Sequence, residues 1–230
     1  MKLVEFIKSE LSGWGRYERI VFPLVIFSII IISIILNDSK IALLSAICGI
    51  SYTILAGKGK ISCYIFGLTG TMCYAWISWQ NHLFGNLMLY MLYYFPMQII
   101  GILKWRKHLN NKTGEIIKTS IQNKTAYFLV TAAAAVIFAY VLYLLKDANP
   151  VIDSITTTFS ITGLIFTIKR AIEQWYLWAV VNALSTVMWI EAYFNGSNCF
   201  ATILMWGIYF ILAIYFLYTW KKDLIKNKIL

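Results

Sequence analysis

Long runs of hydrophobic residues, separated by short polar or basic stretches, recur along the whole chain. A membrane-spanning helix needs about 20 mostly apolar residues. Apolar and polar residues do not alternate within these runs, as they would in a strand with one polar face. Because backbone groups in lipid must be hydrogen-bonded internally, helices are favoured over strands. The pattern predicts an all-α polytopic membrane protein with eight transmembrane helices, at Ile20–Leu36, Ile41–Ala56, Ile61–Trp79, Phe84–Leu103, Thr125–Leu145, Val151–Ile168, Trp175–Phe194 and Cys199–Trp220.

Residues 1–19 have a different pattern, with apolar side chains at helical spacing and charged ones between them. Leu3, Phe6, Ile7 and Leu11 would share one face of a helix. This spacing predicts a short amphipathic helix that lies on the membrane surface.

The basic residues provide a test of the eight-span topology. When the loops are assigned alternately to the two sides, 18 of the 20 Lys and Arg residues fall on the side of both termini, and only Lys40 and Lys146 fall opposite. Because basic residues collect on the cytoplasmic side, both termini are predicted to be cytoplasmic. The net charge of +10 is then explained by topology and by contact with anionic lipid, without a nucleic-acid partner.

Composition agrees with a membrane protein. The chain is 60% hydrophobic and only 13% charged, whereas a soluble domain carries about 25% charged residues. A soluble enzyme, a disordered chain and a nucleic-acid-binding module are therefore poor interpretations.

A weak internal repeat relates the two halves of the chain. Ile47-Cys48-Gly49 resembles Ile161-Thr162-Gly163 at a spacing of 114, and Trp76 resembles Trp189 at a spacing of 113. Tyr94 matches Tyr209, and Trp105-Arg106-Lys107 matches Trp220-Lys221-Lys222, both at a spacing of 115. The shared spacing predicts two three-helix repeats.

The run Thr125–Leu145 adds one crossing between these repeats, so they are predicted to be parallel, as in sugar-transporting SWEET proteins. Such repeats usually place a substrate site at their interface; the alternative is a duplication without a transport role. The expected parts are an N-terminal surface helix and first span (1–38), repeat 1 (39–105), a basic cytoplasmic loop and linking helix (106–146), repeat 2 (147–222) and a basic C-terminal tail (223–230).

Chemistry-bearing residues do not indicate an enzyme. The four cysteines form no CxxC pair and the two histidines are too few for a His-based zinc site, so neither a metal nor a cofactor is expected. The carboxylates Asp153, Glu173 and Glu191 all fall near predicted helix ends. Because intramembrane carboxylates usually mark ion pathways, their absence at depth favours a facilitator over a proton- or sodium-coupled transporter.

Two helix faces could bind a ligand. Trp175, Trp178 and Asn182 stand at i, i+3 and i+7 and are expected to share one face. Two indoles with an amide suit a flat cationic ring, at about 0.5–2 kcal/mol per cation–π contact. The alternatives are an aromatic belt at the membrane interface for the tryptophans and an interhelical hydrogen bond for Asn182.

The second face lies in the run Phe84–Leu103. Asn86, Tyr90, Tyr94 and Gln98 recur every four residues, and Pro96 predicts a kink. Gln98 near the midplane needs a partner, which could be a substrate amide or hydroxyl, or a neighbouring helix.

These residues resemble the PnuC family of nicotinamide riboside transporters over about residues 40–222. The motifs that carry the resemblance are Tyr93-Tyr94-Phe95-Pro96-Met97-Gln98-Ile99-Ile100-Gly101 with Trp105, Asp153-Ser154, Lys169-Arg170, and Glu173-Gln174-Trp175-Tyr176-Leu177-Trp178 with Asn182. The resemblance implies a three-plus-one-plus-three helix core with an extra N-terminal span, and a homotrimer in the bacterial inner membrane.

It also implies uptake of nicotinamide riboside by facilitated diffusion, with a cytoplasmic kinase trapping the substrate. The family's substrate site, carried to matching positions, falls on Trp175, Trp178, Asn182 and Gln98. Helix-face geometry adds Tyr94, Tyr90, Asn86 and Trp76. Two alternatives stay open: a transporter of the same fold for thiamine, riboflavin or a deoxynucleoside, and a membrane vitamin sensor that does not transport.

Overall fold

A computed structural model describes residues 7, 9–10, 12–35, 39–80, 82, 87–110, 113–147, 149–196 and 200–226. These residues form two compact units, Met1–Ile117 and Lys118–Leu230. The helices of the first unit are α2 (Arg16–Ile35), α3 (Lys40–Gly57), α4 (Cys63–Gln80), the π-helical segment η1 (Leu89–Tyr94) and α6 (Phe95–Arg106). Those of the second are α7 (Lys124–Leu144), α8 (Pro150–Ile168), α9 (Gln174–Phe194) and α10 (Phe200–Lys226).

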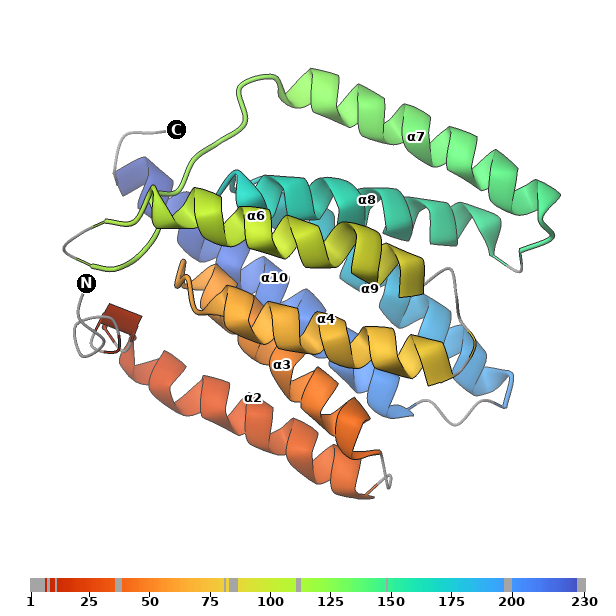
Figure 1. The fold of residues 1–230 in the computed structure, drawn as a ribbon, viewed down its shortest axis with the longest axis horizontal. Helices are drawn as coiled ribbons and strands as arrows, with labels where there is room; N and C mark the ends of the chain where they lie inside the picture. Colours follow the sequence, from red (N-terminus) through yellow and green to blue (C-terminus); the bar gives the residue numbers. More distant parts are fainter. Residues whose placement is uncertain are drawn as a thin grey trace. The chain divides into compact units, whose positions relative to one another are not determined.

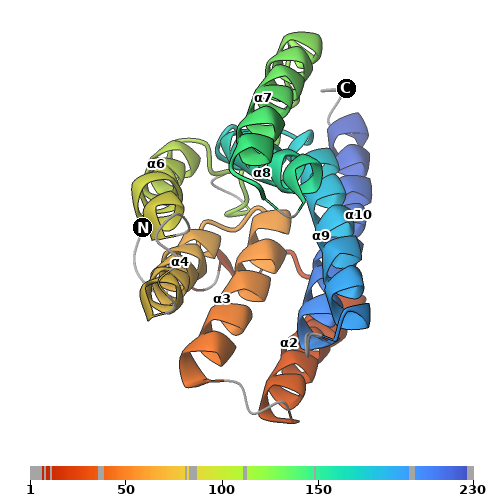
Figure 2. The same ribbon diagram turned by 90° about the vertical axis from the view of Figure 1, so that its right-hand side faces the viewer.

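Within each unit, helices that are neighbours in sequence pack against each other (Figures 1 and 2). In the first unit α3 contacts α2 and α4, and α4 contacts η1 and α6. In the second unit α8 contacts α7 and α9, and α9 also contacts α10. Local sequence signals start these helices: the Ser39 side chain accepts from the Ala42 amide at 3.2 Å, and Pro150 occupies the first turn of α8.

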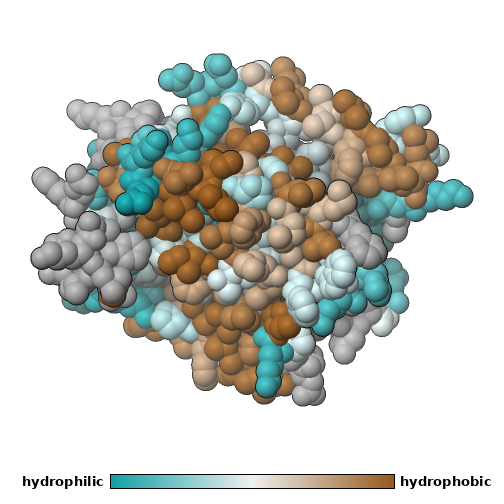
Figure 3. Space-filling view, in the orientation of Figure 1, coloured by the Kyte–Doolittle hydropathy of each residue, from teal (hydrophilic) through white to brown (hydrophobic). Residues whose placement is uncertain are grey.

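The predicted all-helical fold is confirmed for the described residues. Six of the helices, α2, α3, α7, α8, α9 and α10, are long and apolar enough to cross a membrane. Large hydrophobic side chains are widely exposed, among them Phe128 and Val136 on α7, and they cover large parts of the face seen in Figure 3. Such surfaces require lipid rather than water, so this is a multi-pass membrane protein.

The turn between α3 and α4 and the turn between α8 and α9 have the same backbone geometry. Gly59 and Arg170 both have a positive φ, of 70° and 62°. The Gly59 amide donates to the Ala56 carbonyl at 3.0 Å, and the Arg170 amide donates to the Thr167 carbonyl at 2.9 Å. Because α4 begins at residue 63 and α9 at residue 174, the two turns match at a spacing of 111.

In each unit a backbone amide from a distant segment donates to the carbonyl of the positive-φ residue in the turn; this segment follows the turn in the first unit and precedes it in the second. The Ile116 amide donates to the Gly59 carbonyl at 2.9 Å, and the Thr119 amide donates to the Arg170 carbonyl at 2.9 Å. The spacing of 111 differs from the spacing of 113 by which Trp76 was matched with Trp189. In the register of the turns, Trp76 corresponds instead to Val187.

Each unit has a fully buried tryptophan toward the C-terminal end of its last helix, Trp105 on α6 and Trp220 on α10. Trp105 meets the Tyr64 ring edge-on at 5.0 Å, and Trp220 meets the Trp175 ring edge-on at 5.7 Å. Trp105 and Trp220, which the sequence repeat matches at a spacing of 115, therefore have similar buried aromatic surroundings.

The segment containing Pro96 departs from a single α-helix. The π-helical turns of Leu89–Tyr94 come directly before α6, and Pro96 lies in the first turn of α6. Proline has no N–H to donate, so the α-helical ladder cannot run through it unbroken. The predicted kink is therefore realised as a change of helix type, a feature often found at functional sites.

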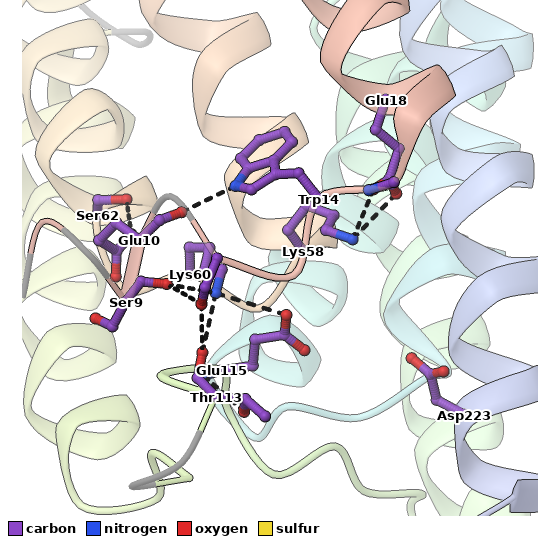
Figure 4. A network of polar contacts seen from close by, with 12 residues as sticks. Ser9, Glu10, Trp14, Glu18, Lys58, Lys60, Ser62, Thr113, Glu115 and Asp223 are labelled. Carbon is purple, nitrogen blue, oxygen red and sulfur yellow. Dashed lines mark hydrogen bonds and ion pairs between the residues drawn. The ribbon is translucent and has the colours of Figure 1, made fainter.

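The predicted surface helix at the N-terminus lies partly outside the described residues: of its four apolar residues Leu3, Phe6, Ile7 and Leu11, Ile7 alone is described. Ser9 and Glu10 of this segment contact loops of the first unit (Figure 4).

Candidate functional site

Gln98 is the central polar residue of the first unit. Its side chain is 5% exposed, and its Nε2 donates to the Thr71 hydroxyl at 3.1 Å. The Oε1 atom is buried without a hydrogen-bond partner among the described residues. An unsatisfied buried acceptor costs about 1–3 kcal/mol, so this carbonyl has capacity for a ligand donor.

Gly67 makes room for this amide. A Cβ at Gly67 would lie 2.0 Å from Gln98 Oε1 and 2.8 Å from both Cδ and Nε2. The amide thus occupies a notch in α4 that only glycine leaves open.

A reciprocal notch joins the same two helices. A Cβ at Gly101 on α6 would lie 2.3 to 2.5 Å from the ring and hydroxyl atoms of Tyr64 on α4. Tyr64 is itself fully buried against Trp105. Two glycines, one on each helix, therefore set how closely α4 and α6 approach.

A ladder of tyrosines lies beside the π-helical segment. Tyr74 and Tyr90 stack with ring centroids 4.9 Å apart, and Tyr90 and Tyr94 stack at 5.2 Å. Tyr90 and Tyr94 were predicted to share a face, and the structure brings them together. Trp76 is 51% exposed and, within the described part of the chain, has no ring contact with this ladder, while Asn86 lies outside the described residues.

Trp178 is the central aromatic residue of the second unit. Its indole lies over Gly163 of α8, where a Cβ would be 3.2 to 3.5 Å from three ring carbons. The indole Nε1 donates to the Thr167 hydroxyl at 3.3 Å, and that hydroxyl donates to the Gly163 carbonyl at 2.9 Å. Asn182, one turn further along α9, is 6% exposed.

Trp175 packs differently from Trp178. It is 2% exposed and lies against Phe216 at 5.2 Å and Trp220 at 5.7 Å, both on α10. The two indoles therefore pack against different helices, α10 and α8, rather than forming the single wall that their spacing predicts. The Trp175 Nε1 is buried with no hydrogen-bond partner among the described residues.

The two units place complementary residues at matching positions. In the register of the turns, Gly67 and Thr71 correspond to Trp178 and Asn182. At the spacing of Trp105 and Trp220, Gln98 corresponds to the buried Ala213. The first unit has a small residue on α4 and an amide on α6, whereas the second unit has an indole on α9 and a small residue on α10.

A buried polar cluster joins the N-terminal segment to the loops of the first unit (Figure 4). The fully buried Lys60 ammonium donates to the Ser9 carbonyl at 2.8 Å and the Thr113 carbonyl at 3.2 Å, and it pairs with Glu115 at 3.5 Å. Burial lowers the pKa of Lys60, which the nearby carboxylates oppose. Burial raises the pKa of Glu10, against a hydrogen bond from Ser62.

A second cluster surrounds Glu173, immediately before α9. The carboxylate accepts from Ser120 Oγ at 2.7 Å, the Ile121 amide at 3.0 Å and Lys124 Nζ at 2.9 Å. Burial alone would raise the pKa of Glu173, but these donors together hold it below its usual value. The motif residue Glu173 thus fastens the loop that precedes α7.

Within the described helices, charged side chains lie near the helix ends. Carboxylates in these helices occur only near their first or last turns: Glu18, Asp153, Glu191 and Asp223. Among the described residues, no three His, Cys, Asp or Glu side chains cluster as metal ligands. The buried polar groups available deep in the helices are amides, hydroxyls and indole N–H groups.

Sequence reasoning missed the residues that hold the site side chains. Gly67 and Gly163 each begin the same pattern, glycine, leucine, two residues and threonine, at 67–71 and 163–167. This recurrence was visible in the sequence, but its meaning depends on which side chains pack into the notches.

Known proteins resemble the chain over most of its length. A model of the nicotinamide mononucleotide transporter family matches residues 39–222. The "Nicotinamide riboside transporter PnuC" of Neisseria mucosa is 34% identical, over 96% of this chain and 87% of its own. The protein of the same name from Haemophilus influenzae is 30% identical, over 96% and 97%. A solved structure, "Crystal structure of the Vitamin B3 transporter PnuC", matches with a TM-score of 0.79 and 32% identity, covering 96% of this chain and 97% of that one.

Proposed function

Because this chain belongs to the nicotinamide mononucleotide transporter family, we propose that it imports nicotinamide riboside by facilitated diffusion. The observation that carries this proposal is that each unit holds one candidate binding group, a buried amide at Gln98 in the first and an indole packed over Gly163 at Trp178 in the second, in a family whose relatives are named nicotinamide riboside transporters. The substrate is a flat pyridinium cation with a carboxamide and a ribose. An indole face attracts such a ring, and amides can satisfy its hydrogen-bonding groups.

The proposed substrate-binding residues are those of the two helix faces: Trp175, Trp178, Asn182, Gln98, Tyr94, Tyr90, Asn86 and Trp76. Trp178 supplies a ring face, and Gln98 supplies an acceptor. Trp175 supplies a buried indole N–H that has no acceptor among the described residues and could donate to the substrate.

Riboside is favoured over mononucleotide by charge. A phosphate monoester is recognised by Arg or Lys, by helix N-termini or by backbone N–H groups. The sequence has no Lys or Arg between Lys60 and Lys104, or between Arg170 and Lys221. The two stretches that hold the proposed binding residues therefore offer no Lys or Arg to a phosphate.

An uncoupled mechanism is favoured by the placement of carboxylates. In the described helices they lie near the ends, whereas proton and sodium pathways usually need carboxylates at depth. Net uptake would then depend on removal of the substrate, which we assign to a cytoplasmic kinase that phosphorylates it.

The proposed assembly is a homotrimer in the bacterial inner membrane with both termini in the cytoplasm. Eight spans, with like-oriented repeats at 39–105 and 147–222 and a linking helix in 106–146, account for the charge distribution. The matching turns of the two units support a repeat.

Uptake by purified protein in proteoliposomes tests this function. Labelled nicotinamide riboside should enter with saturable kinetics, unchanged by a protonophore, and nicotinamide mononucleotide should not compete. Abolition of uptake by the protonophore would refute the uncoupled mechanism. Binding without uptake would favour the vitamin sensor.

The substrate alternatives can be separated by thermal shift. Nicotinamide riboside should raise the melting temperature of the detergent-solubilised protein more than thiamine, riboflavin or a deoxynucleoside at equal concentration. A larger shift with any of the other three would reassign the substrate.

A further inference from the structure

Two of the proposed binding side chains, Gln98 in the first unit and Trp178 in the second, are held by the same local arrangement of a glycine and a threonine. On α4, Gly67 leaves the notch that receives the Gln98 amide, and Thr71 accepts its N–H at 3.1 Å. On α8, Gly163 underlies the Trp178 indole, and Thr167 accepts its N–H at 3.3 Å. In both cases the glycine and the threonine are four residues apart and therefore lie on one face of their helix.

The threonine hydroxyl of each pair accepts an N–H from the side chain that lies against the glycine. The Thr167 hydroxyl donates to the Gly163 carbonyl, so the hydroxyl proton is already used and its oxygen is left to accept the indole N–H. The Thr71 hydroxyl accepts the Gln98 Nε2 at 3.1 Å. The Gln98 Oε1 has no hydrogen-bond partner among the described residues and is therefore available as an acceptor.

We propose that these two glycine–threonine cradles, Gly67 with Thr71 and Gly163 with Thr167, are positioning elements that fix the Gln98 amide and the Trp178 indole for recognition of nicotinamide riboside. The proposal rests on the proposed function for the identity of the ligand. It assigns the four cradle residues no contact with the substrate: they act through the side chains they hold.

Valine and serine variants of the two threonines separate positioning from general packing. Thr71→Val and Thr167→Val keep the shape of the side chain and remove the acceptor. One hydrogen bond contributes about 0.5–1.5 kcal/mol, so each variant should bind nicotinamide riboside about 2- to 12-fold more weakly by isothermal titration calorimetry. Thr71→Ser and Thr167→Ser keep the acceptor and should bind within about twofold of the unmodified protein.

The same helices offer matched controls. Thr69 on α4 and Thr156 on α8 each donate to a carbonyl of their own helix, at 2.9 Å and 3.0 Å. Among the described residues, neither hydroxyl is hydrogen-bonded to another helix. Thr69→Val and Thr156→Val therefore lose a comparable intrahelical bond without touching a cradle. Both should retain full affinity.

Alanine substitutions of the two glycines are expected to reduce affinity by different amounts. A methyl group at Gly67 would overlap the Gln98 amide at 2.0 Å, whereas one at Gly163 would meet the Trp178 ring at 3.2 Å, which a shift of a few tenths of an ångström relieves. Gly67→Ala should therefore reduce affinity at least as much as Gln98→Ala. Gly163→Ala should have the smaller effect.

A spectroscopic signal reports one cradle without any ligand. In protein labelled with 15N at tryptophan, the Trp178 indole N–H resonance is identified by its absence in Trp178→Phe. Its proton should move upfield in Thr167→Val, because the hydrogen bond is lost, and stay in place in Thr156→Val. A purely structural role for Thr167 gives no reason for this selective shift.

The outcomes distinguish the two proposals. Unmodified protein that does not bind nicotinamide riboside overturns the proposed function and the recognition role of the cradles with it. Normal binding by the unmodified protein and by both valine variants overturns the positioning proposal alone. An unmoved Trp178 resonance in Thr167→Val, or a Gly163→Ala defect larger than that of Gly67→Ala, would also overturn it.

Discussion

Replacement of Gly101 by alanine is expected to destabilise the first unit strongly, because the added methyl group has no space. Its Cβ would lie 2.3 to 2.5 Å from three atoms of Tyr64. Ordinary van der Waals contact between carbon atoms begins near 3.5 Å. Either the ring or the helix must therefore move by about 1 Å.

Tyr64 cannot move easily. Its side chain is fully buried, and the Trp105 ring meets it edge-on at 5.0 Å. Overpacking of a rigid core site typically costs about 1–3 kcal/mol, while the gain in helix propensity from glycine to alanine is at most about 1 kcal/mol. The net effect should be a loss of stability.

Gly207 provides the matched control, because a Cβ there would meet nothing within 4 Å. Both variants would be unfolded thermally in the same detergent and followed by intrinsic fluorescence. Gly101→Ala should melt several degrees below the unmodified protein, and Gly207→Ala at or slightly above it. Equal melting temperatures for the two variants would refute the reasoning, since they would mean that α4 and α6 are not held together at this notch.

Three further changes probe other parts of the molecule. Trp178→Ala should weaken nicotinamide riboside binding by about 0.5–2 kcal/mol, or about 2- to 30-fold, by calorimetry; unchanged affinity in a well-folded variant would remove this residue from the site. The pKa of Glu173 is held low in the folded protein, so its stabilising effect is present at neutral pH and is lost as the pH falls through that lowered value. Glu173→Gln should therefore lower the melting temperature at pH 7, with a gap that narrows toward pH 4; a constant gap would contradict the assignment. Lys60→Met removes the cation that donates to the Ser9 and Thr113 carbonyls. Amide hydrogen exchange across residues 9–14 should therefore become faster. Unchanged exchange would show that other contacts hold this segment.

The helices could be predicted closely because hydrophobic run length alone determines most of their bounds. The expected span Thr125–Leu145 corresponds to α7 (Lys124–Leu144), and Val151–Ile168 corresponds to α8 (Pro150–Ile168). The π-helical turns of η1 could not be predicted in this way. They depend on which carbonyl each amide bonds, and hydropathy carries no information about that choice.

The packing of the proposed site residues could not be predicted from their spacing in the sequence. Trp175 and Trp178 are three positions apart, which in a helix of 3.6 residues per turn separates them by about 60°. Since α9 contacts both α8 and α10, this angle is enough for the two rings to pack against different helices. Sequence spacing identifies a broad face, and the neighbours of the helix divide it.

Small residues explain why the two units, despite matching turns, offer different chemistry. Gly67 and Ala213 occupy the positions that correspond to Trp178 and Gln98. Each unit can therefore seat one large polar or aromatic side chain, and the small residue at the corresponding position decides which helix supplies it. An identical pair of units would present two amides or two rings. In this chain one unit instead presents an amide, Gln98, and the other presents an indole, Trp178.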